Sequence, residues 1–556
     1  MLLGRARLPS KVFRISKHSG RVWTFSDAAL PGRLLLPRTV MLFNSFSFLF
    51  LFLPVVFIGF FAFARVGKGW AAGWLAAASL FFYGWWSVAY IPLLLGSIVF
   101  NYWAGARIGA AQGSARARLL ALAVTLDLAL LAYFKYADFF IDSVNRVSAA
   151  YLPVLPLLHL VLPIGISFFT FTQIAFLVDT SRGKVSEVRF VHYLLFVTYF
   201  PHLIAGPVLH HKEMMPQFDL DQTYRPSSAN LAVGLSIFAL GLAKKVLIAD
   251  NLAPHAGFFF DGADTPSLLL AWGGVLAYTF QLYFDFSGYS DMAIGLSRLF
   301  GIRLPLNFNS PYKSHNIIEF WRRWHMTLSR FLRDYLYIAL GGNRHGPARR
   351  YLNLMTTMVL GGLWHGAGWN YVVWGFLHGA YLMLNHAWAG VAARLGLDGS
   401  HRGMRAASVA LTFIAVCVAW VFFRAADVSR AATIVQGLFG VYGVGLPESI
   451  GNYLGTGQAL LERAGVTFYL GGGSRFMETW SWVTVGAGLA FLFPNTQQIM
   501  DRFDPALDYA ASAPLGLARR ALHWRASTAW ALWIGALCVA SLLSLSRPAE
   551  FLYFQF

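Results

Sequence analysis

The stretch YLNLMTTMVLGGLWHGAGWNYVVWGFLHGAYLMLNHAWAGVAA, residues 351–393, contains no Asp, Glu, Lys or Arg. Its length suffices for two bilayer crossings at about 20 residues each. His365 opens a glycine-rich break, HGAGWN, where unwound backbone could line a cavity. His365 and His378 are candidate site residues, because ionisable groups at membrane depth are costly. They can face one lumen only if the helix breaks at Gly366 or Gly368; otherwise at least one is an ordinary core histidine.

The rest of the chain has the composition of a multi-pass membrane protein. Of its 556 residues, 57% are hydrophobic and 12% are charged, against about 25% charged in soluble domains. We therefore expect an all-α fold with roughly eleven to thirteen transmembrane helices, plus re-entrant and amphipathic helices around a central tunnel. The expected spans lie at about 41–64, 70–104 (two), 117–137, 151–178, 190–210, 229–249, 268–300, 351–388 (two), 407–424, 478–494 and 528–546.

The net charge of +19 is uneven along the chain. Residues 1–40 hold eight Lys and Arg but one acid, and the first span opens abruptly at Met41. We expect residues 1–40 to be either a cytoplasmic basic extension or sequence upstream of a physiological start at Met41, followed by a membrane domain over 41–556. Basic loops beside spans reflect topology and anionic lipid, so no nucleic-acid partner is expected.

Several classes of site lack a sequence signature. The two cysteines, Cys417 and Cys538, lie in apolar runs, so the sequence supports no cysteine-based zinc site and we predict no metal. No phosphate-binding loop or dinucleotide fingerprint accompanies a strand–helix unit, which argues against an ATP-driven pump or a nicotinamide enzyme.

Residues 316–344 form a polar interruption between two apolar segments. Placed at 100° intervals from Trp321, their apolar side chains share one arc of a helix, and the arginines take the opposite side. Such a helix suits an interfacial or re-entrant position. His325 falls on the apolar side, so it is a second candidate; the alternative is a core histidine bonded to a backbone carbonyl.

Long motifs give the sequence a family resemblance. It resembles the membrane-bound O-acyltransferase superfamily, and within it the alginate O-acetyltransferase membrane subunits, over nearly all of residues 41–556. The motifs that carry the resemblance include LPIGISFFTF (162–171), FPHLIAGPVLHHKEMMPQF (200–218), GLAKKVLIADNLA (241–253), YFDFSGYSDMAIGLSRLFGIRLPLNFNSPY (283–312), FWRRWHMTLSRFLRDYLYIALGGNR (320–344) and GGLWHGAGWNYVVWGFLHG (361–379).

The resemblance implies that the essential histidine of the superfamily is His365, in LWHG. A second polar residue tends to precede it, and FWRRWH places His325 there. Because burial disfavours imidazolium, a neutral His365 could act as general base toward a hydroxyl that attacks a thioester. His325 would position or polarise the acyl carbonyl. The resemblance gives His378 less weight.

The resemblance also implies acetyl-CoA as the acyl donor, with no tightly bound cofactor. Arg322, Arg323, Lys244 and Lys245 could contact its phosphates, although anchoring to lipid phosphates is an equally good account of each residue. Tyr553, three residues from the end, could relay an acetyl group as a phenyl ester. Its alternative role is in an interfacial aromatic belt.

The expected location is the bacterial inner membrane, in contact with membrane lipid. Because no soluble hydrolase-like domain is present, the resemblance implies a periplasmic SGNH-type acyltransferase, or a polysaccharide-modification complex, as partner. The predicted reaction is acetyl transfer across the membrane for O-acetylation of an exopolysaccharide, foremost alginate. Cellulose, peptidoglycan or another envelope polymer, and D-alanine transfer to teichoic acid, are alternatives. A polysaccharide-precursor transporter is the alternative from another class, with buried His and Asp residues as a proton path.

Overall fold

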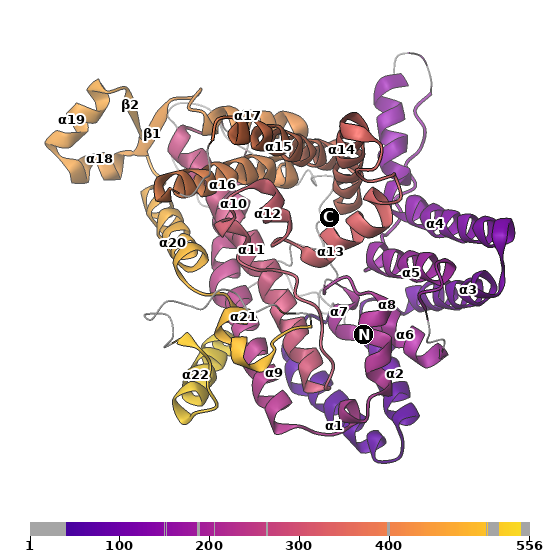
Figure 1. Cartoon of the computed structure of the whole chain (residues 1–556). Helices are drawn as coiled ribbons and strands as arrows, with labels where there is room; N and C mark the ends of the chain where they lie inside the picture. The colour runs from indigo at the N-terminus through magenta and orange to yellow at the C-terminus, as the bar shows by residue number, and fades with distance from the viewer. Residues whose placement is uncertain are drawn as a thin grey trace, which may run out of the picture. The chain divides into compact units, whose positions relative to one another are not determined.

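A computed structural model describes residues 41–545, apart from 149–150, 152, 186–188, 205, 263–264, 397–400, 508 and 510–521. The basic segment 1–40 and Tyr553 lie outside the described residues. Within the described part the fold is built almost wholly from helices, so the predicted all-α class is confirmed (Figure 1). The exception is one pair of short parallel strands, β1 (Val444–Pro447) and β2 (Val466–Tyr469), in which Val444 lies opposite Val466.

The helices follow one another along the chain with the following bounds. The first half contains α1 (Leu53–Ala64), α2 (Lys68–Trp86), α3 (Ile91–Ala110), α4 (Gly113–Ser148), α5 (Ile166–Ser181), α6 (Phe190–Thr198), α7 (Phe200–Leu203), α8 (His211–Met214), α9 (Ser228–Ala243), α10 (Asp250–Asp261) and α11 (Leu268–Leu299). The second half contains α12 (Ile317–Trp321), α13 (Met326–Phe331), α14 (Gly346–His365), α15 (Trp369–Arg394), α16 (Arg402–Arg424), α17 (Val428–Leu438), α18 (Glu448–Leu454), α19 (Thr456–Arg463), α20 (Gly473–Leu492), α21 (Thr496–Ile499) and α22 (Thr528–Ser544).

Four helical segments of the described chain are long and apolar enough to cross a membrane. They are Val88–Ala110, Gly113–Ser148, Ser228–Asp261 and Arg402–Arg424. Shorter apolar helices occupy Phe48–Ala64, Ile166–Ser181 and Thr528–Ser544. The expected total of eleven to thirteen crossings stays a prediction.

Two of the expected spans are not continuous helices. In the region 151–178, helix begins only at Ile166, because Pro153, Pro156 and Pro163 precede it. The region 190–210 is divided into the short helices α6 and α7, which are separated at Tyr199. The length of each apolar segment therefore overestimated the length of its helix. Proline removes helical hydrogen bonds even where the surrounding residues are hydrophobic.

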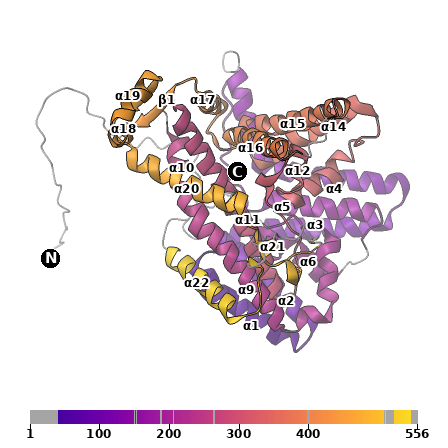
Figure 2. The same ribbon diagram turned by 60° about the vertical axis from the view of Figure 1, so that its left-hand side comes forward.

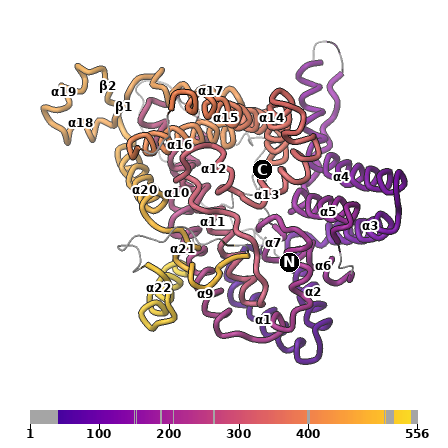
Figure 3. Tube along the Cα trace, viewed as in Figure 1, coloured from indigo at the N-terminus to yellow at the C-terminus, as the bar shows by residue number. Residues whose placement is uncertain are grey.

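The long helix α11 is buried along most of its length. It packs against α9, α10, α16, α17 and α20 (Figure 2). The helices α14, α15 and α16 run beside one another (Figures 1 and 2), and α15 packs against both α14 and α16. In the trace of Figure 3, the short helices α12 and α13 are drawn between α11 and α14. In the segment between α12 and α13, Trp324 and His325 are buried, whereas Arg322 is exposed.

Candidate active site

A break between α14 and α15 brings His365 into the interior. Helix α14 ends at His365, and α15 begins at Trp369 after an extended turn at Gly366 and Gly368. The helix break that the glycine-rich stretch after His365 predicted is thus present. The two helices then pack so closely that a Cβ on Gly375 would lie 2.4 Å from a backbone carbonyl oxygen of α14. Glycine is needed at that position because any side chain would separate the helices.

The second histidine lies at another break. The expected continuous amphipathic helix over 316–344 is wrong, because helix α12 ends at Trp321 and α13 begins only at Met326. Tertiary hydrogen bonds replace the helical ones: the Met326 N–H donates to the backbone oxygen of Asn307 at 2.9 Å. His325 itself adopts left-handed backbone angles, φ 42° and ψ 52°, which are uncommon outside glycine and cluster at functional sites.

The two breaks place the imidazoles of His325 and His365 side by side. Their ring centroids are 6.3 Å apart, and the side chains are 0% and 8% exposed, respectively. Because a hydrogen bond spans about 3 Å, one small reacting group could contact both rings. The sequence-predicted pair is therefore brought together by elements that are separated along the chain.

Aromatic rings close the space around His365. A cavity of about 20 Å³, room for about one water molecule, adjoins its ring. The cavity is lined by Leu282, Phe286, Trp324, His365, Trp374, Trp420 and Phe423. These side chains come from four helices and the α12–α13 connection, so the packing of the core leaves room for no more than about one water molecule beside the histidine.

Asn307 fixes the hydrogen position on His325. Its Oδ1 atom accepts from the Thr327 N–H at 3.3 Å and from the Thr327 hydroxyl at 2.9 Å, which identifies this atom as the amide oxygen. The same oxygen lies 3.1 Å from Nδ1 of His325, so Nδ1 carries the hydrogen. In the neutral ring, Nε2 is then an acceptor, and it is buried without a partner among the described residues.

This tautomer alters one expected role. A neutral His325 cannot polarise an acyl carbonyl, because that requires a donor and its free nitrogen is an acceptor. It can still position a substrate that carries an N–H or O–H group. The sequence alternative of a bond from His325 to a backbone carbonyl is not what the structure shows, since the partner is the side chain of Asn307.

Helix α4 holds the end of α14 from a distant part of the chain. Lys135 donates to the carbonyl of Trp364 and, at 3.4 Å, to that of His365. The hydroxyl of Tyr136 donates to the Leu363 carbonyl at 2.9 Å. These are carbonyls that a helix end leaves unsatisfied, and a cation there also complements the helix dipole. Sequence reasoning missed Lys135, although a cation deep within the apolar segment 117–137, far from Arg118 at its start, was a signal that could have found it.

His378 lies apart from the pair. The ring centroid of His378 is 4.8 Å from that of Trp374. The ring centroid of Trp374 is in turn 5.1 Å from that of His365. His378 is 0% exposed, and neither of its ring nitrogens has a hydrogen-bond partner among the described residues. The indole of Trp374 thus contacts both histidines, and the structure does not bring His378 to the reacting space.

A larger cavity begins next to His325. It has a volume of about 570 Å³, and Met326 and Thr327, which directly follow His325, are in its wall. Three guanidinium groups also line it, those of Arg322, Arg330 and Arg333. Of these, Arg330 is paired with Glu213 at 2.5 Å and Arg333 with Asp334 at 2.7 Å.

The other predicted donor-binding residues are engaged elsewhere. Arg323 is paired with Glu319 at 2.7 Å and is not among the lining residues of the large cavity. Lys244 is paired with Asp291 at 2.6 Å. Lys245 is 1% exposed and lies between Asp250 and Asp285, at 2.6 Å from each.

These buried pairs place the lysines away from the arginine-lined cavity and give Asp285 and Asp291 a structural role. Both acids lie inside α11. Among the predicted cations, only Arg322 lines the cavity beside His325.

Comparison of the sequence with known proteins identifies its family. The model of the membrane-bound O-acyltransferase family (MBOAT) matches residues 114–426, which include Lys135, Asn307, His325 and His365. The peptidoglycan O-acetyltransferase of Helicobacter pylori is 46% identical over 436 residues, covering 73% of this chain and 81% of the relative. The probable alginate O-acetylase AlgI of Pseudomonas aeruginosa is 46% identical over 404 residues, covering 72% and 75%.

A more distant relative is the teichoic acid D-alanyltransferase of Streptococcus thermophilus, 28% identical over 292 residues, or 47% of this chain and 68% of the relative. The long match to the family and the extensive identity to its members lead to one conclusion. The chain belongs to the membrane-bound O-acyltransferase family and is an O-acyltransferase.

Proposed function

We propose that this enzyme transfers an acetyl group from acetyl-CoA to a hydroxyl acceptor in the space between His325 and His365. The observation that carries the proposal is the pair of neighbouring imidazoles, with ring centroids 6.3 Å apart, in an aromatic site beside an arginine-lined cavity. Guanidinium groups bind phosphate oxygens well, so Arg322 is the residue proposed to contact the donor. A volume of about 570 Å³ is within the usual range for ligand pockets.

His365 is the proposed general base. As the hydroxyl oxygen attacks the thioester carbonyl carbon, His365 takes the hydroxyl proton; the carbon–sulfur bond then breaks, and the leaving thiolate recovers the proton from the imidazolium. The products are an acetyl ester and free CoA thiol. Burial supports this role, because it disfavours imidazolium in the resting enzyme. The small apolar space at His365 also limits competing hydrolysis of the thioester.

His325 is the proposed donor-positioning residue. Its Nε2 atom is an acceptor, and the arm of CoA next to the thioester carries amide N–H groups that can donate to it. The two histidines should therefore differ kinetically. His365→Ala should abolish acetyl transfer by lowering kcat, whereas His325→Ala should act mainly by raising KM for the donor.

The proposed acceptor is a cell-envelope or extracellular polysaccharide, foremost alginate, because two relatives that are each 46% identical to this chain are named for peptidoglycan and alginate O-acetylation. We place the enzyme in the bacterial inner membrane with its donor on the cytoplasmic side. Transfer to a polymer outside the cytoplasm would then need a periplasmic SGNH-type acyltransferase as partner, and Tyr553 is the proposed relay to it.

The test separates an enzyme from a transporter. Cells that carry His365→Ala should export polymer in normal amounts but without acetyl esters, measured by alkaline release of acetate. Loss of export would instead support the transporter alternative. His378→Phe is the matched control, since His378 is buried in the same aromatic region but does not reach the reacting space. Purified enzyme with labelled acetyl-CoA then tests the donor directly.

A further inference from the structure

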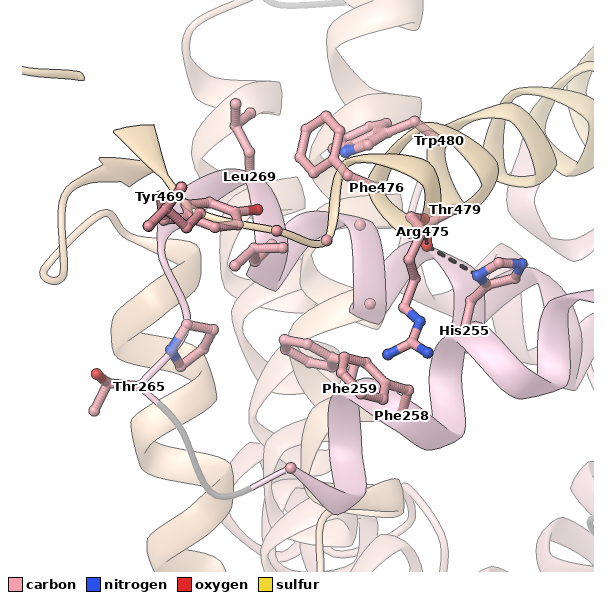
Figure 4. A pocket seen from close by; sticks show the side chains of 18 of the residues that line it. His255, Phe258, Phe259, Thr265, Leu269, Tyr469, Arg475, Phe476, Thr479 and Trp480 are labelled. Carbon is pink, nitrogen blue, oxygen red and sulfur yellow. Dashed lines mark hydrogen bonds between the residues drawn. The ribbon is translucent and has the colours of Figure 1, made fainter. Parts of the chain in front are cut away.

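A second cavity, of about 400 Å³, lies apart from the histidine pair (Figure 4). It is formed where α10 ends, where α11 and α20 begin, and by the chain that follows β2. Its wall is mostly apolar and includes Phe258, Phe259, Leu269, Phe476 and Trp480. It shares no lining residue with the cavity beside His325, so it is a separate site.

Charged residues mark this end of the helices as a membrane boundary. The candidate spans Ser228–Asp261 and Arg402–Arg424 both end here, each on a charged residue. These two residues are paired, with Arg424 Nη2 3.3 Å from Asp261 Oδ1. Because charged groups at the ends of apolar helices lie at the headgroup level, the cavity opens where lipid headgroups and acyl chains meet.

Two guanidinium groups line the cavity, and they differ in the contacts that hold them. Arg430 donates to the Phe259 carbonyl at 3.2 Å. The guanidinium carbon of Arg475 lies 3.7 Å from the ring centre of Phe258, and Figure 4 shows the group extending over that ring into the cavity. Within the described part of the chain, no carboxylate lies at ion-pair distance from Arg475, and Glu478 on the next turn of α20 is not a lining residue.

We propose that this cavity binds an anionic glycerophospholipid, with the lipid phosphate on Arg475 and an acyl chain along the aromatic and leucine side chains. Charge and shape together favour this occupant. A soluble anion would leave the apolar wall in water, and an uncharged lipid would leave the guanidinium without a counter-charge. The hydrogen bond between His255 and Thr479, 3.0 Å long, joins α10 to α20 in the wall of the cavity.

The test uses the purified full-length enzyme in detergent. Phosphatidylglycerol should bind and raise the melting temperature, whereas phosphatidylcholine should have a smaller effect. Arg475→Gln should weaken phosphatidylglycerol binding about fivefold, since one cation near a lipid surface contributes a factor of that order. Arg475→Lys should retain most of the binding. Because Arg475 is exposed, the variant should fold.

Three results would overturn the proposal. The first is an equal loss of binding in Arg344→Gln, the matched control, because Arg344 is exposed but lines none of the cavities described above. The second is equal binding of phosphatidylcholine. The third is equal stabilisation by glycerol 3-phosphate, which would identify the site as one for free phosphate.

Discussion

Lys135 should control the rate of acetyl transfer without touching a substrate. Its ammonium group donates to the carbonyls of Trp364 and His365, and a hydrogen bond to a charged group contributes about 1.5–3 kcal/mol. Lys135→Met keeps the apolar stem but leaves these carbonyls unsatisfied at the helix end that carries the base. If half of that energy is added to the activation free energy because His365 is displaced, kcat falls by a factor of about 3–12.

The assay is steady-state transfer from acetyl-CoA with purified Lys135→Met. We expect the loss in kcat, with KM for the donor unchanged, because Lys135 does not line the arginine-lined cavity. Lys135→Arg should restore much of the rate, since it also carries N–H donors and a positive charge. Tyr136→Phe is the matched control that removes a neutral bond from the same helix end, and should cost less. A Lys135→Met enzyme with unchanged kcat, or one whose defect is confined to KM, would refute the positioning argument.

Three other predictions follow from packing, tautomer and charge. Asn307→Leu should raise KM for the donor about five- to tenfold, because His325 loses the oxygen that fixes its Nδ1 hydrogen, whereas Asn307→Asp should raise it less. Gly375→Ala should lower stability by about 1–3 kcal/mol through its clash with α14, measured by thermal unfolding; Gly390→Ala, on the same helix with open space around it, should not. Burial lowers the pKa of His210 and of His211, which lie outside the membrane-crossing helices of the structure. Their contribution to stability is therefore complete above pH about 6.5 and declines on acidification toward pH 5. A His210→Gln, His211→Gln double variant should show a smaller loss of melting temperature over that range.

Local sequence patterns were sufficient where a local cause determines the structure. The glycines after His365 predicted the helix break, and the apolar arc of 316–344 predicted that His325 is buried. The same arc could not predict the break at His325, because tertiary hydrogen bonds to Asn307 determine it. The ion pairs of Lys244 and Lys245 could not be predicted from the sequence for a related reason, because their partners Asp291 and Asp285 lie on another helix. The predicted contact of these lysines with donor phosphates stays a prediction.

The positions of the two sites along the chain suggest which residues can vary within the family. The histidine pair, Arg322 and the supporting Lys135 and Asn307 all lie inside the matched region 114–426. Arg475 and the strand β2 lie beyond it, as do Phe476 and Trp480 of the lipid cavity. The members of the histidine site hold one another through hydrogen bonds, so loss of one displaces the others, whereas Arg475 is exposed and can be replaced without disturbing the rest of its cavity. Relatives should therefore keep the histidine pair with its supports as a unit, and differ in whether a cation stands at the position of Arg475.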